Sequence, residues 1–169
     1  MFSFRFHNKK YEDKKLNESL FDILNNNKLL SIATINSKKE SYINTAYYSF
    51  DEKLKLYIIT NPKSNHSINL SKNYSVAVSI FDSHLKFWED KLQGVQLFGK
   101  GYKTPISQLP KGTSCFIKRF PPFKEIVKNP KDFMKKSVTV MLYTLEISRI
   151  KLFDEKRFGE ENFIELKLR

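Results

Sequence analysis

The chain is poor in cysteine and in long apolar runs, and each shortage excludes a class of protein. Its single cysteine, Cys115, cannot form an internal disulfide, so we expect a protein of a reducing compartment. No apolar run approaches the ~18 residues that a membrane-spanning helix needs, and residues 1–6 lack the long uncharged segment of a signal peptide. The sequence therefore predicts a cytoplasmic protein that does not enter a membrane.

Histidine is also scarce, and its distribution argues against a metal site. The three histidines, His7, His66 and His84, lack the spacing of metal ligands and have no clustered carboxylates or cysteines beside them. We therefore expect no bound metal. The absence of a Gly-x-Gly-x-x-Gly turn, together with early strand patterns that have no helix between them, disfavours a doubly wound α/β sheet.

Positive charge, by contrast, is abundant, with a formal net charge of +12. Such a balance suggests nucleic acid as a partner, because clustered cations release counterions from a phosphate backbone. The densest basic region, residues 118–136, is interrupted by prolines and phenylalanines, and the other lysines are spread over nearly every turn. Nucleic-acid binding through this basic region is therefore an alternative that we do not favour.

The length and the hydrophobic content predict one domain over residues 1–169. The 169 residues are 40% hydrophobic and 14% aromatic, which is enough to bury a core without disulfides. Apolar residues at helical spacing predict an amphipathic helix over residues 11–25. Alternating apolar residues predict strands over residues 29–35, 41–50, 54–60, 74–81, 94–102, 137–147, 150–153 and 163–168.

The order of these elements predicts a mainly β (α+β) fold. Most of the strands are joined by turns of hairpin length, which favours antiparallel pairing. Residues 104–136 are broken by prolines, and we expect short helical pieces there, over 116–120 and 123–128. The sequence thus predicts an antiparallel barrel with an N-terminal helix and short decorating helices.

The most informative segment is residues 53–70, where a strand pattern ends abruptly in a polar turn. The turn is Thr60-Asn61-Pro62-Lys63-Ser64-Asn65-His66, and residues 67–71 follow it as a predicted short helix. This order brings backbone N–H groups, hydroxyls and a cation to one point, which makes a socket for a phosphate-bearing ligand. The alternative is that Ser64 only caps the helix and Pro62 only turns the chain.

The order of these segments resembles the pyridoxamine-5′-phosphate-oxidase-like superfamily of FMN-binding split β-barrels. The resemblance covers most of the chain. It depends on residues 30–35, 42–50, 56–60, 64–70 and 94–99. Within the superfamily, the chain is similar to the uncharacterised YhbP-like branch through residues 119–121, 145–154 and 158–159.

The resemblance implies a homodimer that holds FMN in a cleft between the subunits. It implies that the phosphate lies at the turn from Thr60 to His66, and that the flavin ring lies against the second and third strands. The cofactor-binding residues that it implies are Thr45, Ala46, Ile59, Thr60, Asn61, Lys63, Ser64, Asn65 and His66. FAD or a deazaflavin would offer a phosphate to the same turn, so the sequence does not distinguish them from FMN.

The chain departs from the superfamily pattern in two places. Relatives often have Ser-Arg-Lys where this chain has Ser64-Asn65-His66, which removes two fixed cations and weakens a site for a dianion. Lys63, or His66 when it is protonated, can replace part of that charge. The chain also lacks the Arg-Leu-x-Pro-like segment near the C-terminus of the full oxidases, so pyridoxamine-5′-phosphate oxidase activity itself is not expected.

The resulting hypothesis is an FMN-binding protein that acts as a flavin-dependent oxidoreductase on an unidentified small substrate. No catalytic residue is predicted, because flavin chemistry resides on the cofactor. The alternatives are a cofactor-free ligand or interaction module of the same fold, and the nucleic-acid-binding protein already described. Among the other residues, we expect packing roles for Tyr47, Tyr48 and Trp88, a solvated Arg119, and strand bends at Gly94, Gly99 and Gly101.

Overall fold

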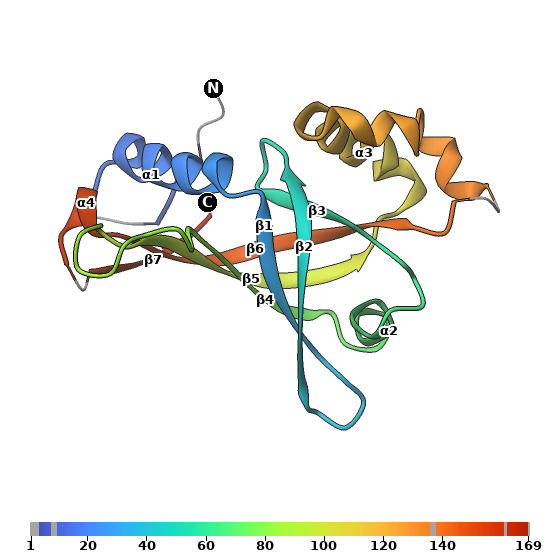
Figure 1. The fold of residues 1–169 in the computed structure, drawn as a ribbon. Coiled ribbons are helices and arrows are strands. Elements are labelled where there is room, and N and C mark those ends of the chain that lie inside the picture. The colour runs from blue at the N-terminus through green and yellow to red at the C-terminus, as the bar shows by residue number, and fades with distance from the viewer. Residues whose placement is uncertain (1–3, 8–9, 136–137, 161, 169) are drawn as a thin grey trace.

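The computed structural model describes residues 4–7, 10–135, 138–160 and 162–168, and its ribbon is drawn in Figure 1. Its strands form one antiparallel sheet in the order β3-β2-β1-β4-β5-β6-β7. The strands are β1 (Leu29–Ile35), β2 (Ser41–Phe50), β3 (Lys55–Thr60), β4 (Ser75–Phe81), β5 (Gln93–Lys103), β6 (Met141–Asp154) and β7 (Phe163–Lys167). Because β3 also pairs with β6, six strands close into a barrel and β7 extends one side of it.

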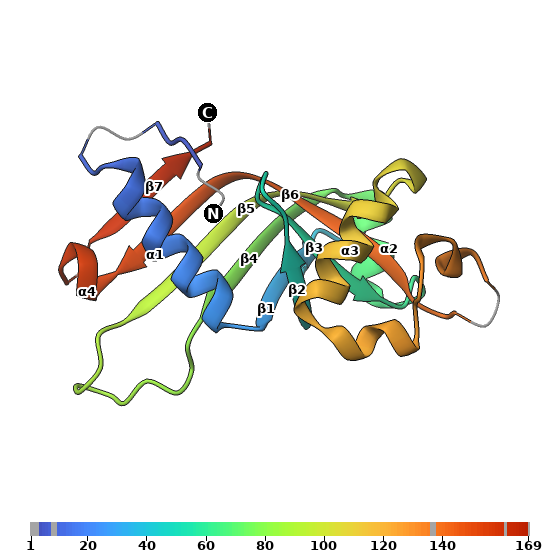
Figure 2. The same cartoon turned by 90° about the horizontal axis from the view of Figure 1, so that it is seen from above.

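Four α-helices decorate this barrel. They are α1 (Asp13–Asn26), α2 (Asn65–Lys72), α3 (Leu109–Arg119) and α4 (Glu155–Phe158), and three short 3-10 helices, η1 (Ile106–Gln108), η2 (Pro121–Glu125) and η3 (Pro130–Met134), flank or follow α3. Seen from above, α1 lies across β4 and β5, whereas α3 lies against β2 and β3 (Figure 2). The predicted mainly β split-barrel class is confirmed. Among the described residues, no helix is long and apolar enough to cross a membrane.

The core follows from the apolar patterns of the sequence. Leu16, Leu20, Ile23 and Leu24 form one stripe of α1 and are buried against the barrel. In β1 and β4 every second residue is buried, and these residues pack in the same core as the apolar stripe of α1. A second, smaller cluster under α3 contains Tyr57, Leu109, Phe116, Val127, Phe133 and Leu142.

The predicted break between two strands within residues 137–153 is wrong. The two strands expected over 137–147 and 150–153 are one strand, β6, which begins at Met141; residue 137 lies outside the described residues. Opposite the step from Phe98 to Gly99, β6 contains one extra residue, Ser148, whose hydroxyl donates to the Phe98 carbonyl at 3.2 Å. This bulge interrupts the alternation without ending the strand, which is why the pattern predicted a break there.

The helical segment after β5 also differs from the prediction. One continuous helix, α3, replaces the piece expected over 116–120, because Pro110 lies in its first turn, where a missing N–H costs no hydrogen bond. Of the piece expected over 123–128, only the first three residues are helical, within η2. The short helix α4 was not predicted at all.

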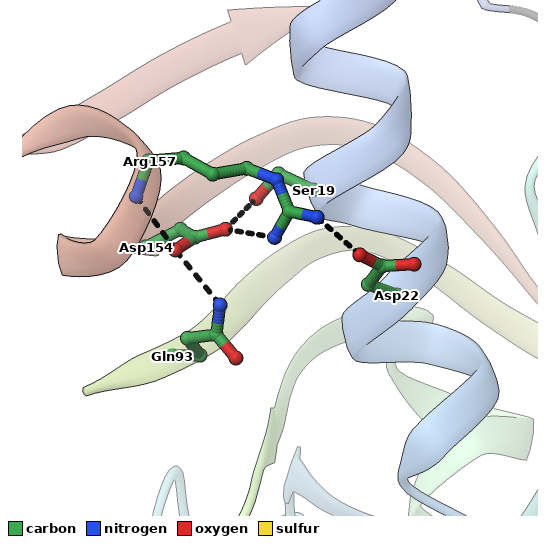
Figure 3. Close-up of polar contacts among 5 residues, drawn as sticks. All are labelled: Ser19, Asp22, Gln93, Asp154 and Arg157. Atoms are coloured by element: carbon green, nitrogen blue, oxygen red, sulfur yellow. Dashed lines mark hydrogen bonds and ion pairs between the residues drawn. The ribbon is translucent and has the colours of Figure 1, made fainter. Parts of the chain in front are cut away.

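A polar network joins α1 and α4 to the end of β6, and Figure 3 shows its five residues. The fully buried carboxylate of Asp154 accepts hydrogen bonds from Ser19 Oγ at 2.7 Å and from Gln93 Nε2 at 2.8 Å. It also accepts from Arg157, through the backbone N–H at 3.1 Å and through Nη1 at 2.9 Å. Arg157 also forms an ion pair with Asp22 on α1, so connected polar contacts attach this helix to the barrel.

Candidate functional site

The predicted phosphate turn lies where β3 ends and α2 begins. Thr60 is the last residue of β3, and α2 starts at Asn65, two residues earlier than the pattern predicted. Leu70 holds α2 in the core, and Asn69 donates to the Thr34 hydroxyl of β1 at 3.0 Å. The turn is therefore fixed at both ends, by a barrel strand and by a docked helix.

Ser64 occupies the N-cap position of α2 but does not cap the helix with its side chain. Its hydroxyl donates to the Asn61 carbonyl at 2.7 Å and lies 2.9 Å from Ser67 Oγ. The first N–H groups of a helix have no partner within the helix, and here Ser64 does not satisfy them. The turn thus keeps free backbone donors, as an anion socket requires.

The imidazole of His66 lies at the centre of the turn. It is 5% exposed, and its Nε2 atom lies 2.5 Å from Thr60 Oγ1 and 3.1 Å from Ser64 Oγ. Burial lowers the pKa of His66 below its ordinary 6.5, so the ring is neutral at pH 7. His66 can therefore supply part of the missing charge only below this lowered pKa, and at neutral pH the cationic side chain of the turn is the exposed Lys63.

An open groove of about 940 Å³ runs from this turn along β2 and β3. It is lined by Lys28, Asn44, Thr45, Ala46, Tyr47, Ile59, Thr60, His66, Phe116, Phe120, Pro122, Phe123, Glu125 and Ile126. Five of the predicted cofactor residues, Thr45, Ala46, Ile59, Thr60 and His66, thus face one space. The other four, Asn61, Lys63, Ser64 and Asn65, belong to the turn itself and do not line the groove.

The opposite wall of the groove, from Phe116 to Ile126, was not foreseen from the sequence. It consists of the end of α3 and of η2, with Phe120 packed edge-on against Tyr47 at a ring distance of 5.4 Å. The dense aromatic and proline content of residues 116–123 was the available signal. It was interpreted as a break between helical pieces, and nothing local indicates that this segment lies against β2.

The aromatic residues outside the turn have different roles. Tyr48 packs in the core, as expected, and its hydroxyl donates to the Leu24 carbonyl at 2.8 Å. Tyr47 contacts Phe120 but remains 58% exposed beside the groove. The packing role expected for Trp88 is wrong, because the ring is 90% exposed in the loop between β4 and β5 and contacts only Phe87 among the described aromatic rings.

Arg119 is not the solvated residue that was expected. Its Nη2 atom donates to the carbonyls of Leu24 at 2.6 Å and Asn27 at 2.8 Å, at the end of α1. Its guanidinium lies 4.6 Å from the centre of the Tyr48 ring, and burial lowers its pKa. Arg119 therefore joins α3 to α1 and does not reach the phosphate turn.

Among the three glycines of β5, the expected strand irregularity is found at Gly99, whereas close packing explains Gly94 and Gly101. Gly99 lies at the bulge, where an added Cβ would be 2.0 Å from the Glu146 carbonyl oxygen. At Gly94, the ring of Phe153 occupies the space of a side chain. Gly101 lies among the side chains of Leu70, Val76 and Leu145.

The described residues contain no group of three or more His, Cys, Asp or Glu side chains that could hold a metal ion. Two residues of the basic region have partners within the chain. Arg119 points to the carbonyls at the end of α1, and Lys135 pairs with Asp132 at 2.6 Å.

The fold is similar to those of several solved cofactor-binding proteins. A heme binding protein from Mycobacterium smegmatis matches 95% of this chain and 60% of its own length, with a TM-score of 0.70 at 9% identity. HutZ, a heme storage protein from Vibrio cholerae, matches 81% of this chain and 94% of its own, with a TM-score of 0.63 at 13% identity. A FAD-binding protein from Mesorhizobium loti matches 79% of this chain and 90% of its own, with a TM-score of 0.59 at 14% identity.

These similarities concern the fold alone. They show that the chain shares its split β-barrel fold with these solved proteins, two of which are named for heme and one for FAD. The chain spans 60% of the length of the mycobacterial protein and 51% of a second similar structure, from Agrobacterium tumefaciens. No protein-family model matches the sequence, and no curated protein is similar to it in sequence.

Proposed function

We propose that the chain binds FMN in the groove beside β2 and β3, with its phosphate at the turn between Thr60 and His66. The observation that carries this proposal is the continuity of an apolar-walled groove with a helix start whose N–H groups Ser64 leaves free. A groove of about 940 Å³ lies within the size range of small-molecule sites. Apolar walls with a few polar groups at one end are typical of such sites.

The residues present fit the two ends of this cofactor. Ala46, Ile59 and Phe120 offer flat apolar contacts for a ring system. At the other end, the first N–H groups of α2, the Thr60 hydroxyl and Lys63 would hold the phosphate. Bound flavin would supply the redox chemistry, which makes an oxidoreductase acting on a small substrate the activity that we propose. Membership of the YhbP-like branch and a cytoplasmic location stay predictions.

Heme is a weaker candidate for this groove. A heme iron needs a ligand such as a histidine nitrogen. His66 is the only histidine in the lining of the groove, and its Nε2 atom already lies within hydrogen-bond distance of Thr60 and Ser64. Those contacts direct the nitrogen into the turn, which favours a role in the phosphate site over axial ligation.

The cofactor-free module of the same fold is the second candidate, and one observation favours it. Thr60, Ser64, His66 and Ser67 are hydrogen-bonded to one another, so a phosphate must replace bonds that the side chains already make. The neutral imidazole leaves Lys63 as the one cationic side chain within the turn. The two candidates differ in one measurable property, the affinity for a phosphate.

Quenching of FMN fluorescence by the purified protein tests the proposal, with riboflavin as the ligand that lacks the phosphate. We expect saturable quenching by FMN, weaker binding of riboflavin, and a loss of about tenfold in FMN affinity for Lys63→Gln. The matched control is Lys53→Gln, an exposed lysine in the turn between β2 and β3. Equal affinity for FMN and riboflavin, or no quenching by either, would favour the cofactor-free module.

We also propose a homodimer that covers the groove. Ile43, Thr45 and Tyr47 alternate along β2 and point away from the barrel core, with Ile43 70% exposed. Leu29, the partner of Tyr47 on β1, is exposed beside them. Thr45 and Tyr47 also line the groove, so a second copy seated on this ridge would close the groove and exclude water from it.

A further inference from the structure

A second pocket, of about 660 Å³, lies between α1, the end of β2 and α3. Its walls include Phe21 and Phe50, and its polar lining consists of Asn25, Ser49, Glu52, Lys111, Ser114, Cys115, Lys118 and Arg119. It shares no lining residue with the groove proposed for FMN. We call it the cationic pocket, because three basic side chains and one carboxylate line it.

The spacing along α3 explains why the two sites are separate. Ser114 and Cys115 each lie three or four residues from Lys111 and from Lys118, which places all four residues on one side of the helix. Phe116 and Phe120 lie on the other side and line the groove. One helix thus forms a wall of each site, with an apolar surface toward the groove and a polar surface toward the cationic pocket.

Within the part of the chain that the structure describes, one buried hydroxyl of the cationic pocket lacks a hydrogen-bond partner, and two of its basic side chains lack a carboxylate partner. The hydroxyl of Ser49, a residue that is 1% exposed, has no hydrogen-bond partner among the described residues. Arg119 is half-buried, and within the described parts of the chain no carboxylate forms an ion pair with it. The one carboxylate of the lining, Glu52, pairs with Lys111 at 2.6 Å, so among the described residues Lys118 and Arg119 have no carboxylate partner, and Arg119 bonds to the carbonyls of Leu24 and Asn27.

We propose that the cationic pocket binds a small aromatic carboxylate. The carboxylate lies between Arg119 and Lys118 and accepts a hydrogen bond from the Ser49 hydroxyl. A planar guanidinium suits a carboxylate, since both groups are flat and their donors and acceptors match. The ring lies against Phe21 and Phe50, whose own rings are 6.3 Å apart.

Calorimetric titration with benzoate tests the proposal, because its neutral analogue benzamide has nearly the same shape. We expect saturable binding of benzoate and at least about tenfold weaker binding of benzamide, since only the anion makes charge-assisted bonds. Ser114→Phe fills the pocket from the exposed face of α3 and should abolish binding. Lys118→Gln should weaken it about tenfold, whereas Lys124→Gln, outside the pocket, should not change it.

Cys115 provides an independent reporter, because it is the single cysteine and lines the pocket. Burial raises the pKa of its thiol, so alkylation by a maleimide is slow and sensitive to access. Benzoate should slow this alkylation several-fold, and benzamide should not.

Saturating FMN should leave the benzoate affinity unchanged, which separates this site from the groove. Equal binding of benzamide, unchanged binding in Ser114→Phe, displacement by FMN, or no binding of benzoate would each overturn the proposal.

Discussion

At the scale of single residues, His66 shows how burial changes the charge of the phosphate turn. His66 lies in the first turn of α2 with its ring against Thr60, and burial lowers its pKa below 6.5. A sequence alone gives the residue its ordinary pKa and therefore suggests a partial cation near neutral pH. The structure instead gives a buried hydrogen-bonding ring, whose neutral form is favoured because burial penalises the charged form.

The lowered pKa predicts that His66 destabilises the fold in mild acid. The unfolded chain takes up the proton first, so stability is present above about pH 6.5 and is lost as the pH falls from there toward the folded pKa. Replacing His66 with Gln should remove this part of the pH dependence, measured by urea denaturation between about pH 8 and pH 5. The exposed His84→Gln is the control and should behave as the wild type. An unchanged pH dependence in His66→Gln would contradict the prediction.

Gly99, at the bulge, is the glycine of β5 at which we expect an added side chain to be most destabilising. An added Cβ would lie 2.0 Å from the Glu146 carbonyl oxygen, which belongs to the backbone and cannot move aside. We expect Gly99→Ala to lower the free energy of unfolding by about 1–3 kcal/mol in urea denaturation. Gly101→Ala is the matched comparison, because its nearest atoms, at 2.9 to 3.0 Å, are side-chain methyl groups that can shift. A larger loss for Gly101→Ala would show that the close approach at the bulge is not the cause.

At the scale of elements, local patterns predicted what local interactions determine. The bounds of β1 and β2 match the prediction because alternation and polar turns specify both strands from within. The ends of α3 and the continuity of β6 were missed, because Pro110 is compatible with a first helical turn and Ser148 is absorbed by a bulge. The error in β6 occurred where pairing with β5 outweighed the local signal, whereas the error in α3 came from treating a proline of the first helical turn as a break.

The same distinction applies to the candidate site. Thr60 and His66 were predicted together because a strand, a turn and a helix start are adjacent in the sequence, and both line the groove. The wall from Phe116 to Ile126 was not predicted, since it reaches β2 only through the tertiary packing of α3. Periodicity in a single sequence carries no information about which face of a barrel a distant helix will cover.

The network around Asp154 determines how α1 and α4 dock, and it predicts a strong effect of one substitution. Burial acts to raise the pKa of Asp154, but hydrogen bonds from Gln93, Ser19 and Arg157 outweigh it and hold the pKa below its ordinary value. The contribution to stability is therefore present above about pH 4 and is lost as the pH falls through the folded pKa. Removing the charge should leave Arg157 with Asp22 alone.

We expect Asp154→Asn to lower the free energy of unfolding by about 3 kcal/mol near neutral pH, measured by urea denaturation. The difference from the wild type should shrink in acid, because the wild-type carboxylate is then protonated. Asp22→Asn is the control, since Asp22 is half exposed and its ion pair should contribute about 1 kcal/mol or less. Equal losses of unfolding free energy for the two variants would mean that the buried Asp154 contributes no more to stability than the half-exposed Asp22.

At the scale of the whole molecule, closure of the barrel leaves one ridge of β2 without cover. The pairing of β3 with β6 completes the barrel, and the residues of β2 that point away from the core then form an outer surface. Ile43 and Tyr47 on this ridge are 70% and 58% exposed, which is unusual for large apolar residues in a strand. The ridge adjoins the groove, so dimerisation and cofactor binding should be coupled.

This coupling predicts the behaviour of Ile43→Asp. A charge on the ridge would have to be desolvated on association, so the variant should be monomeric by light scattering where the wild type is dimeric. If the second copy closes the groove, the monomer should also bind FMN about tenfold more weakly, because the ring remains exposed to water on one side.

Ile106→Asp is the matched control, since Ile106 is 72% exposed on η1, away from the groove. A monomeric wild type would refute the dimer, whereas a monomeric Ile43→Asp with full FMN affinity would refute only the coupling, because the groove of a single chain would then be sufficient.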